Sequence, residues 1–228
     1  MMMQEQMKKV LEQAARLQRL VPDAVLVGGS AAFVYAGHRY SLDHDHIITD
    51  LEDRFDLILD SLEREGDWVT NRVVYGKIIL GELGGIETGI RQLIRKKELE
   101  FQTIQIDKFF LNVPTIEEIT RIKSFLIVKR NQMRDYLDFA ALSDKIGSLR
   151  SAKIIEKLDQ YYSDDSQNEK PVLSQLLRLL SDPMPKDFRS IEHLPDYKGT
   201  VDKWKDWDFI VETCRKVAQK VMEIDSDA

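Results

Sequence analysis

The segment that most constrains the fold is a short apolar run, Ala24 to Val27, which ends directly at Gly28 and Gly29. Such a run suits a buried strand, and two glycines allow the tight turn that has to follow it. The residues from Ser30 to Ala36 then predict a short helix that Gly37 closes. The expected unit is therefore a strand, a Gly-Gly-Ser turn and a helix.

Helical and strand patterns flank this unit in the first half of the chain. The first twenty residues carry apolar side chains at three- and four-residue steps, which predicts an amphipathic helix that stops at Pro22. Residues 53–65 predict a second helix. Several β-rich runs follow, and we expect them to extend the same sheet: Trp68 to Tyr75, Lys77 to Leu80, Ile86 to Ile90 and Leu99 to Ile106.

Two aspartates share one face of the strand predicted at residues 40–49. Strand alternation places Asp43 and Asp45 on that face and His44 and His46 on the other, where the two histidines are expected to pack or hydrogen-bond beneath the site. Carboxylates at positions i and i+2 of a strand lie roughly 6 to 7 Å apart along the chain. This spacing suits a shared metal site.

A metal and a phosphate chain would be bound together here. Oxygen ligands favour Mg²⁺ or Mn²⁺, and such ions typically bind through one or two carboxylates while substrate phosphates and water complete the shell. The Gly28-Gly29-Ser30 turn offers free backbone N–H groups and a hydroxyl to those phosphates. Alone, each element is usually a turn or a solvated strand edge; in this order and spacing, they predict a metal and triphosphate site.

The pattern becomes helical after Pro114. Thr115-Ile116-Glu117-Glu118 matches a capping box ahead of an apolar-periodic segment. Polar breaks at Ser163 to Glu169 and around Ser181 to Pro185 divide this half, and Trp204 and Trp207 precede a last helix that runs to about Glu223.

The predicted fold class is α+β. Residues 1–112 are expected to form a mixed β-sheet with flanking helices, and residues 113–228 are expected to form an all-helical C-terminal domain. The chain of 228 residues is long enough for two modest domains.

Charge and hydropathy narrow the expected partners. A formal net charge of -6 argues against a broad, sequence-independent grip on a nucleic-acid backbone, although the basic stretches at residues 91–97 and 121–134 could supply a local groove. The amino terminus has no apolar region of the kind a signal peptide needs, and no stretch approaches about 18 uninterrupted apolar residues. These features predict a cytoplasmic protein that does not act at a membrane.

Two blocks of sequence resemble a known family. The first is Gly28-Gly29-Ser30-Ala31, followed after a short helix by Gly37-His38-Arg39-Tyr40-Ser41-Leu42-Asp43-His44-Asp45; the second is Lys123, Arg130 and Arg134-Asp135-Tyr136-Leu137-Asp138. Together they resemble the nucleotidyltransferase superfamily and, more closely, its prokaryotic AbiEii-like abortive-infection toxin branch. The resemblance covers roughly residues 20 to 145, and His46 departs from it because family members have an apolar residue there.

The resemblance implies a nucleotidyltransferase-like core that transfers a nucleoside monophosphate from a nucleoside triphosphate to an acceptor hydroxyl. Pyrophosphate would leave, and two metal ions would stabilise the attacking and leaving oxygens. Such sites usually carry a third carboxylate on an adjacent strand, for which Glu87 is the candidate and Glu100 or Asp107 are alternatives. The metal ligands would then be Asp43, Asp45 and Glu87.

The resemblance also assigns roles to further side chains. Lys123 joins the three carboxylates as a catalytic residue, and the nucleotide-binding set is Gly28, Gly29, Ser30, Arg39, Ser41, Arg130 and Arg134. On one continuous helix, positions 123, 130 and 134 would fall within a narrow arc. The alternative is that these cations, and Arg39, pair with nearby carboxylates such as Asp138.

Three classes of function remain open from the sequence. The leading one is an enzyme that modifies a tRNA or other RNA 3′ end, or a protein hydroxyl, with a cognate antitoxin as its partner. The rival is a catalytically silent module that keeps the fold and binds a nucleotide or a partner. The third is a purely structural α/β protein.

Overall fold

The computed structural model describes residues 2–162 and 171–226, and the chain divides into two units. One unit comprises Met1–Val34 and Tyr40–Thr115, and the other comprises Tyr35–Arg39 and Ile116–Ala228. The boundary expected between residues 112 and 113 falls inside the last strand of the first unit. The polar break expected at Ser163 to Glu169 lies outside the described residues.

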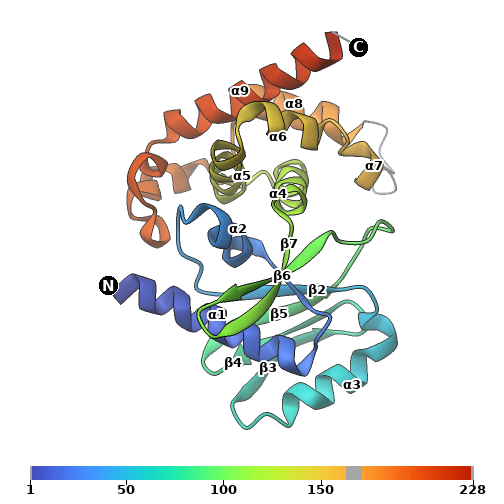
Figure 1. Cartoon of the computed structure of the whole chain (residues 1–228). Helices are drawn as coiled ribbons and strands as arrows, with labels where there is room; N and C mark the ends of the chain where they lie inside the picture. Colours follow the sequence, from blue (N-terminus) through green and yellow to red (C-terminus); the bar gives the residue numbers. More distant parts are fainter. Residues whose placement is uncertain (1, 163–170, 227–228) are drawn as a thin grey trace. The chain divides into compact units, whose positions relative to one another are not determined.

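The first unit is built on a five-stranded mixed sheet with the strand order β1-β2-β5-β4-β3 (Figure 1). β2 and β5 run parallel, and the other three neighbouring pairs are antiparallel. The predicted α+β class with a mixed sheet is confirmed. The strands are β1 (Val25–Val27), β2 (His44–Ile48), β3 (Trp68–Val74), β4 (Ile78–Leu83) and β5 (Ile86–Gln92).

Two helices, α1 (Met2–Leu20) and α3 (Leu51–Glu63), pack with one face of this sheet. The core between them is apolar and combines side chains from both helices with Ile48, Ile79 and Ile90 from the sheet. Both helices were predicted, the first from its apolar periodicity, and α3 begins and ends two residues before the expected range of 53–65. Because cross-strand partners share a face, Asp45 and its partner Gly89 lie on the opposite face of the sheet.

The strand from Phe101 to Ile106 does not extend this sheet, and that expectation was wrong. It forms β6, which pairs antiparallel with β7 (Phe109–Pro114) in a separate two-stranded sheet. The side chain of Gln18 on α1 both donates to the carbonyl of Asn112 and accepts from its N–H, at 2.9 and 2.8 Å. Backbone groups that a sheet edge would have paired are thus satisfied by a helix side chain.

The elements around the glycine turn begin at different residues from those expected. The helix predicted from Ser30 is α2 (Gly28–Ala36), which has both glycines in its first turn. The strand predicted from Tyr40 starts at His44, so Asp43 lies just before it. The predicted alternation is confirmed within β2, since His44, His46 and Ile48 are buried while Asp45 is partly exposed.

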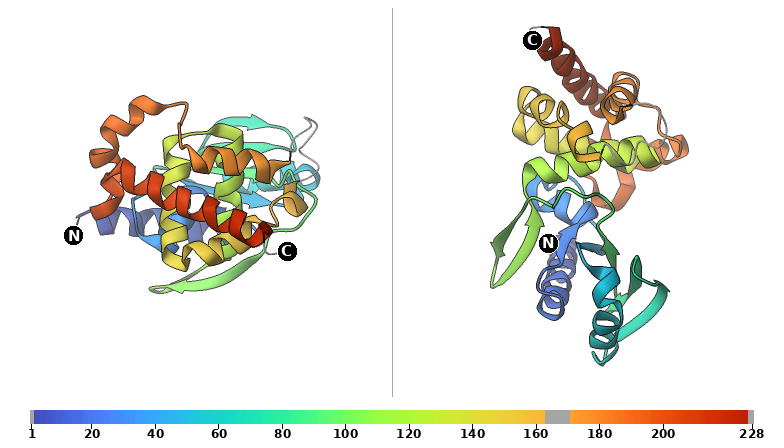
Figure 2. Two further views of the ribbon diagram at one scale, coloured as in Figure 1. Left: turned by 90° about the horizontal axis from the view of Figure 1, so that it is seen from above. Right: turned by 90° about the vertical axis from the view of Figure 1, so that its right-hand side faces the viewer.

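The second unit is helical, and α9 packs along α5, α6 and α8 (Figure 2). Its buried core includes Tyr136, Phe139, Trp204 and Cys214. None of the described helices combines the length and the apolar character needed to cross a membrane. The elements are α4 (Ile116–Arg130), α5 (Met133–Ile146), α6 (Ser148–Ile155), α7 (Asp159–Tyr162), α8 (Val172–Ser181), the 3₁₀ segments η2 (Phe188–Gly199) and η3 (Asp202–Lys205), and α9 (Trp207–Ser226).

The helix is interrupted at Asn131, which separates α4 from α5. The expectation of one continuous helix through residues 123, 130 and 134 was therefore wrong. Asn131 has a positive φ of 52°, which no α-helix accommodates. Its side chain accepts a hydrogen bond from the Tyr136 hydroxyl and donates one to the carbonyl of Met184. Arg134 therefore lies on a different helix from Lys123 and Arg130.

Asn131→Ala should destabilise the protein by about 2 to 4 kcal/mol. The change removes two side-chain hydrogen bonds, each worth about 0.5 to 1.5 kcal/mol. Alanine also adopts the left-handed backbone conformation less readily than asparagine, whose polar side chain can hydrogen-bond locally. Urea denaturation measures the free energy of unfolding, and Lys153→Ala on the exposed side of α6 is the control. A loss within about 0.5 kcal/mol of that control would contradict the role of Asn131.

Candidate functional site

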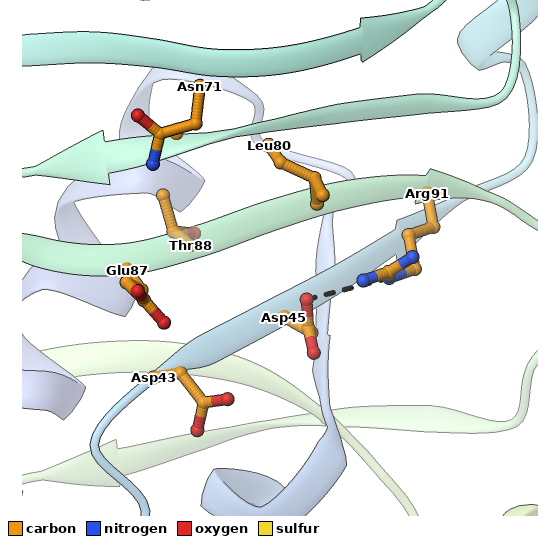
Figure 3. A pocket seen from close by; sticks show the side chains of 8 residues that line it. Asp43, Asp45, Asn71, Leu80, Glu87, Thr88 and Arg91 are labelled. Carbon is orange, nitrogen blue, oxygen red and sulfur yellow. Dashed lines mark ion pairs between the residues drawn. The ribbon is translucent and has the colours of Figure 1, made fainter.

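A pocket in the first unit brings Asp43, Asp45 and Glu87 together (Figure 3). Its volume is about 240 Å³. The other lining residues come from β3, β4 and β5: Asn71, Leu80, Gly81, Thr88 and Arg91. Three carboxylates and one guanidinium thus surround a single space.

The register of the sheet explains why these side chains meet. Asp45 pairs with Gly89 on the parallel strand β5, so both lie on the same face. Alternation along β5 then places Glu87 and Arg91 on that face, one on each side of Gly89. Leu80 on β4 is the other neighbour of Gly89 and also lines the pocket.

Gly89 leaves room for the carboxylate of Asp45. A Cβ at this position would lie 2.6 Å from Asp45 Oδ1, which is closer than real side chains approach. Gly28, at the start of α2, has a φ of +74°, and a Cβ there would lie 3.9 Å from Asp45 Oδ2. The glycine turn is therefore next to this carboxylate, as the spacing of the motif predicted.

Two serine hydroxyls hold Asp43 in place. Ser41 donates to Asp43 Oδ1 at 2.6 Å, and Ser30 donates to the backbone carbonyl of Asp43 at 2.6 Å. Both serines are buried. Ser30 thereby connects the glycine turn to the residue before β2, and its predicted contact with a nucleotide stays a prediction.

Arg91 is the cation of this pocket. Its Nε lies 3.5 Å from Asp45 Oδ1, an ion pair longer than a charge-assisted hydrogen bond (Figure 3). Sequence reasoning placed Arg91 only in a basic stretch, although two-residue steps from Glu87 would have found it. Asn71 was missed because it lies at an irregularity in the pairing of β3 with β4, between Thr70 and Arg72, where alternation fails.

The donor set fits a hard divalent cation bound through one or two carboxylates. Among the residues that the structure describes, no three His, Cys, Asp or Glu side chains are grouped closely enough to hold a metal by themselves. Mg²⁺ does not require such a group, because phosphate and water oxygens usually complete its shell. Glu87 is exposed, whereas Glu100 and Asp107 do not line the pocket and Asp107 pairs with Lys8 at 2.9 Å.

The opposite face of β2 buries two histidines. Their rings lie edge to face with centroids 5.3 Å apart, as expected for packing beneath the site. Thr88 Oγ1 donates to the carbonyl of His44 and lies 2.9 Å from its Nδ1, so that ring nitrogen carries the proton. Burial lowers the pKa of His44 to about 4 and lowers the pKa of His46 well below its usual value. Both rings are therefore neutral at pH 7.

In the second unit, Asp138 gathers two of the cations that the resemblance assigned to the site. Arg39 donates to both of its oxygens, at 2.7 and 2.9 Å, and Lys123 Nζ lies 2.7 Å from Oδ2. His38 Nε2 is 2.8 Å from Oδ1, and all four side chains are buried. Burial by itself raises the pKa of Asp138, but the charges of Arg39 and Lys123 and the hydrogen bond from His38 outweigh it and hold that pKa well below its usual range.

The other two predicted cations also lie in the second unit. Arg130 forms an ion pair with the buried carboxylate of Asp135. Arg134 lines a different pocket, described below. The roles predicted for Arg39, Lys123, Arg130 and Arg134 at a nucleotide stay predictions.

Comparison with known proteins gives distant or partial matches. No family model matches the chain. The "Heme uptake protein MmpL11" of Mycobacterium tuberculosis (strain H37Rv) is 28% identical over 244 residues, and the "Mycolic acid-containing lipids exporter MmpL11" of Mycolicibacterium smegmatis is 34% identical over 113 residues. The first match covers 95% of this chain and 23% of that protein, and the second covers 50% and 11%. This chain thus spans less than a quarter of the length of these curated relatives.

Two solved structures are similar at low identity. An antigenic nucleotidyltransferase-like protein from Paracoccidioides brasiliensis is 16% identical, with a TM-score of 0.46 over 75% of this chain and 92% of that one. A protein from H. pylori is 15% identical, with a TM-score of 0.42 over 95% and 96%. Both TM-scores are below 0.5, so neither likeness establishes the fold or the function of this chain.

Asp138→Asn should destabilise the protein by about 3 to 5 kcal/mol near neutral pH, because it leaves Arg39 and Lys123 buried without their counter-charge. The folded-state pKa of Asp138 lies below its unfolded value of 3.8, so its contribution is present above that pH and is lost as pH falls toward the folded-state pKa. As the pH is lowered below 3.8, the free energy of unfolding should therefore fall less for the variant than for wild type, and the difference between the two proteins should shrink.

Thermal or urea unfolding at several pH values measures this difference. Asp144→Asn is the control, since Asp144 lies on the same helix but forms an exposed pair with Lys203. Such pairs contribute about 0 to 1 kcal/mol. Equal losses for the two variants near neutral pH would show that Asp138 is not the counter-charge we describe.

Proposed function

We propose that the first unit binds a divalent cation and a nucleoside triphosphate and transfers the nucleoside monophosphate to an acceptor hydroxyl. The observation that carries this proposal is the pocket shared by Asp43, Asp45 and Glu87 beside the glycine turn at Gly28. The motif resemblance described above agrees with it.

Asp43 and Asp45 are the proposed metal ligands, with Glu87 on the neighbouring strand. A bound Mg²⁺ or Mn²⁺ would neutralise phosphate charge and stabilise the attacking and leaving oxygens. Ser41 orients the Asp43 carboxylate through its hydrogen bond to Oδ1, and the missing side chain at Gly89 keeps the Asp45 carboxylate at the strand surface. Glu87 lines the pocket and is exposed, and in this proposal it would accept the proton of the acceptor hydroxyl.

The triphosphate would be bound by the first turn of α2 and by Arg91. Backbone N–H groups at the start of a helix have no partner within the helix and favour an anion. Arg91 contacts Asp45 in the structure described here, and phosphate oxygens would offer its guanidinium a better-matched partner. Lys123, Arg39, Arg130 and Arg134 are not required for this scheme.

The acceptor and partner follow only from the resemblance. It adds an RNA 3′ end, including that of tRNA, or a protein hydroxyl as the acceptor, and a cognate antitoxin as the partner of a toxin-like enzyme.

A second function is favoured by the exposure of Glu87 and by the lack of three grouped metal-ligating side chains among the described residues. With these features, the same pocket could bind nucleotide without turning it over. Nucleotide binding without transfer to any acceptor would identify this silent module.

Asp45→Asn should lower metal-dependent transfer by at least about 100-fold, because losing groups that only support metal ligands already costs 10 to 100-fold. The assay measures transfer of label from each of four α-³²P-labelled triphosphates to total cell RNA and protein, with Mg²⁺ or Mn²⁺. Asp56→Asn on the exposed side of α3 is the matched control and should retain full transfer.

Wild-type protein that binds no triphosphate and labels neither RNA nor protein would refute the proposed function. Binding without labelling would support the silent module instead. Equal transfer by the Asp45→Asn variant and wild type would move the chemistry away from this pocket.

A further inference from the structure

A second pocket lies entirely within the helical unit, where α5 begins beside the η2 segment. Its volume is about 250 Å³. The lining residues are Gln132, Met133, Arg134, Asp187, Ser190 and Tyr197. The resemblance assigns Arg134 to a nucleotide, but it gives no role to the other five lining residues, and the proposed function uses none of the six.

Three polar side chains in this pocket have no partner within the described part of the chain. The guanidinium of Arg134 makes no ion pair or hydrogen bond there, although its Nε is buried. The amide of Gln132 and the hydroxyl of Ser190 are also without a hydrogen bond from the described residues. Leaving a buried donor unsatisfied costs about 1 to 3 kcal/mol, so such a group in a cavity needs an explanation.

Asp187 gives the same pocket a hydrogen-bond acceptor. Its Oδ1 accepts the N–H of Met133 at 2.8 Å, which satisfies the start of α5. Its second oxygen makes no hydrogen bond with any described residue. Arg134 and Asp187 line one cavity but do not pair with each other, so each can contact a different part of one ligand.

We propose that this pocket binds the phosphate group of a sugar phosphate. Arg134, Ser190 and Gln132 supply donors for the three terminal oxygens of a phosphate monoester, whereas a carboxylate has only two oxygens to offer. The free oxygen of Asp187 accepts a hydrogen bond from a sugar hydroxyl. Met133 and the ring of Tyr197 provide apolar surface for the sugar carbons.

The size of the cavity agrees with this class of ligand. Pockets for drug-sized ligands typically have about 300 to 1,000 Å³, so about 250 Å³ suits a single phosphorylated sugar. Asp187 would repel a bare phosphate ion, so a ligand that also offers a hydroxyl is preferred. This inference is independent of the proposed function, since all of its residues lie in the second unit.

Isothermal titration calorimetry of the full chain with ribose 5-phosphate and with inorganic phosphate tests the proposal. Wild-type protein should bind ribose 5-phosphate more tightly than inorganic phosphate. Arg134→Gln should weaken ribose 5-phosphate binding by at least about tenfold, and Ser190→Ala should weaken it to a smaller extent. Arg189→Gln is the control, because Arg189 is an exposed arginine of the same segment that does not line the pocket.

Asp187→Asn checks the second half of the site. Asn keeps a side-chain oxygen that can accept the N–H of Met133, so the start of α5 should be preserved while the negative charge is removed. The variant should bind inorganic phosphate more tightly than wild type does. The ratio of its affinities for ribose 5-phosphate and inorganic phosphate should be smaller than in wild type. Circular dichroism of each variant verifies the fold before titration.

The proposal is overturned if wild-type protein binds neither probe, or if Arg134→Gln and Arg189→Gln weaken binding equally. A short RNA oligonucleotide with a 5′-phosphate forms a final arm that distinguishes the source of the phosphate. Competition with ribose 5-phosphate would assign the pocket to an RNA end, and binding of ribose 5-phosphate without such competition would assign it to a free sugar phosphate.

Discussion

The candidate site depends on the position of β2 between two partner strands. Pairing with β1 on one side and β5 on the other fixes the register of β2 and the face of the sheet on which the Asp45 side chain lies. A slip of one residue would turn this carboxylate toward the covered face and bring His44 or His46 to the pocket. The glycine at position 89 completes the constraint, because any side chain there would occupy the space of the Asp45 carboxylate.

The covered face of the same strand is what makes such a slip costly. His44 and His46 are buried and neutral, and His44 is fixed by the hydroxyl of Thr88 on the adjacent strand. Next to them, Ile48 joins the apolar core with α1 and α3. A slip of one residue would expose these two neutral rings in the pocket and bury the Asp45 carboxylate against the apolar core. The chemistry of the pocket is thus supported by packing on the far side of the sheet.

Local periodicity in the sequence predicted much of this arrangement, but features that depend on contacts between distant residues were not predicted. The glycine turn, the alternation of β2 and the helical second half follow from spacing along the chain, whereas Glu87 became a candidate because the resemblance implies a third carboxylate. The separation of the β6–β7 hairpin from the main sheet was not anticipated, because long-range contacts such as that of Gln18 with the backbone of Asn112, 94 residues away, do not show in local spacing. Similarly, the row of cations expected on one helix is divided at Asn131, whose left-handed backbone is held by contacts with Tyr136 and Met184.

In the proposed function, Asp43 and Asp45 hold a divalent cation beside the glycine turn when a triphosphate is bound. The most direct measurement is anomalous diffraction from crystals grown with Mn²⁺ and a non-hydrolysable nucleoside triphosphate analogue. We predict a manganese peak in contact with both aspartate carboxylates and with phosphate oxygens, and phosphate density at the N–H groups of Gly28 and Gly29. Nucleotide bound elsewhere, or bound in this pocket with no manganese at Asp43 and Asp45, would contradict the account.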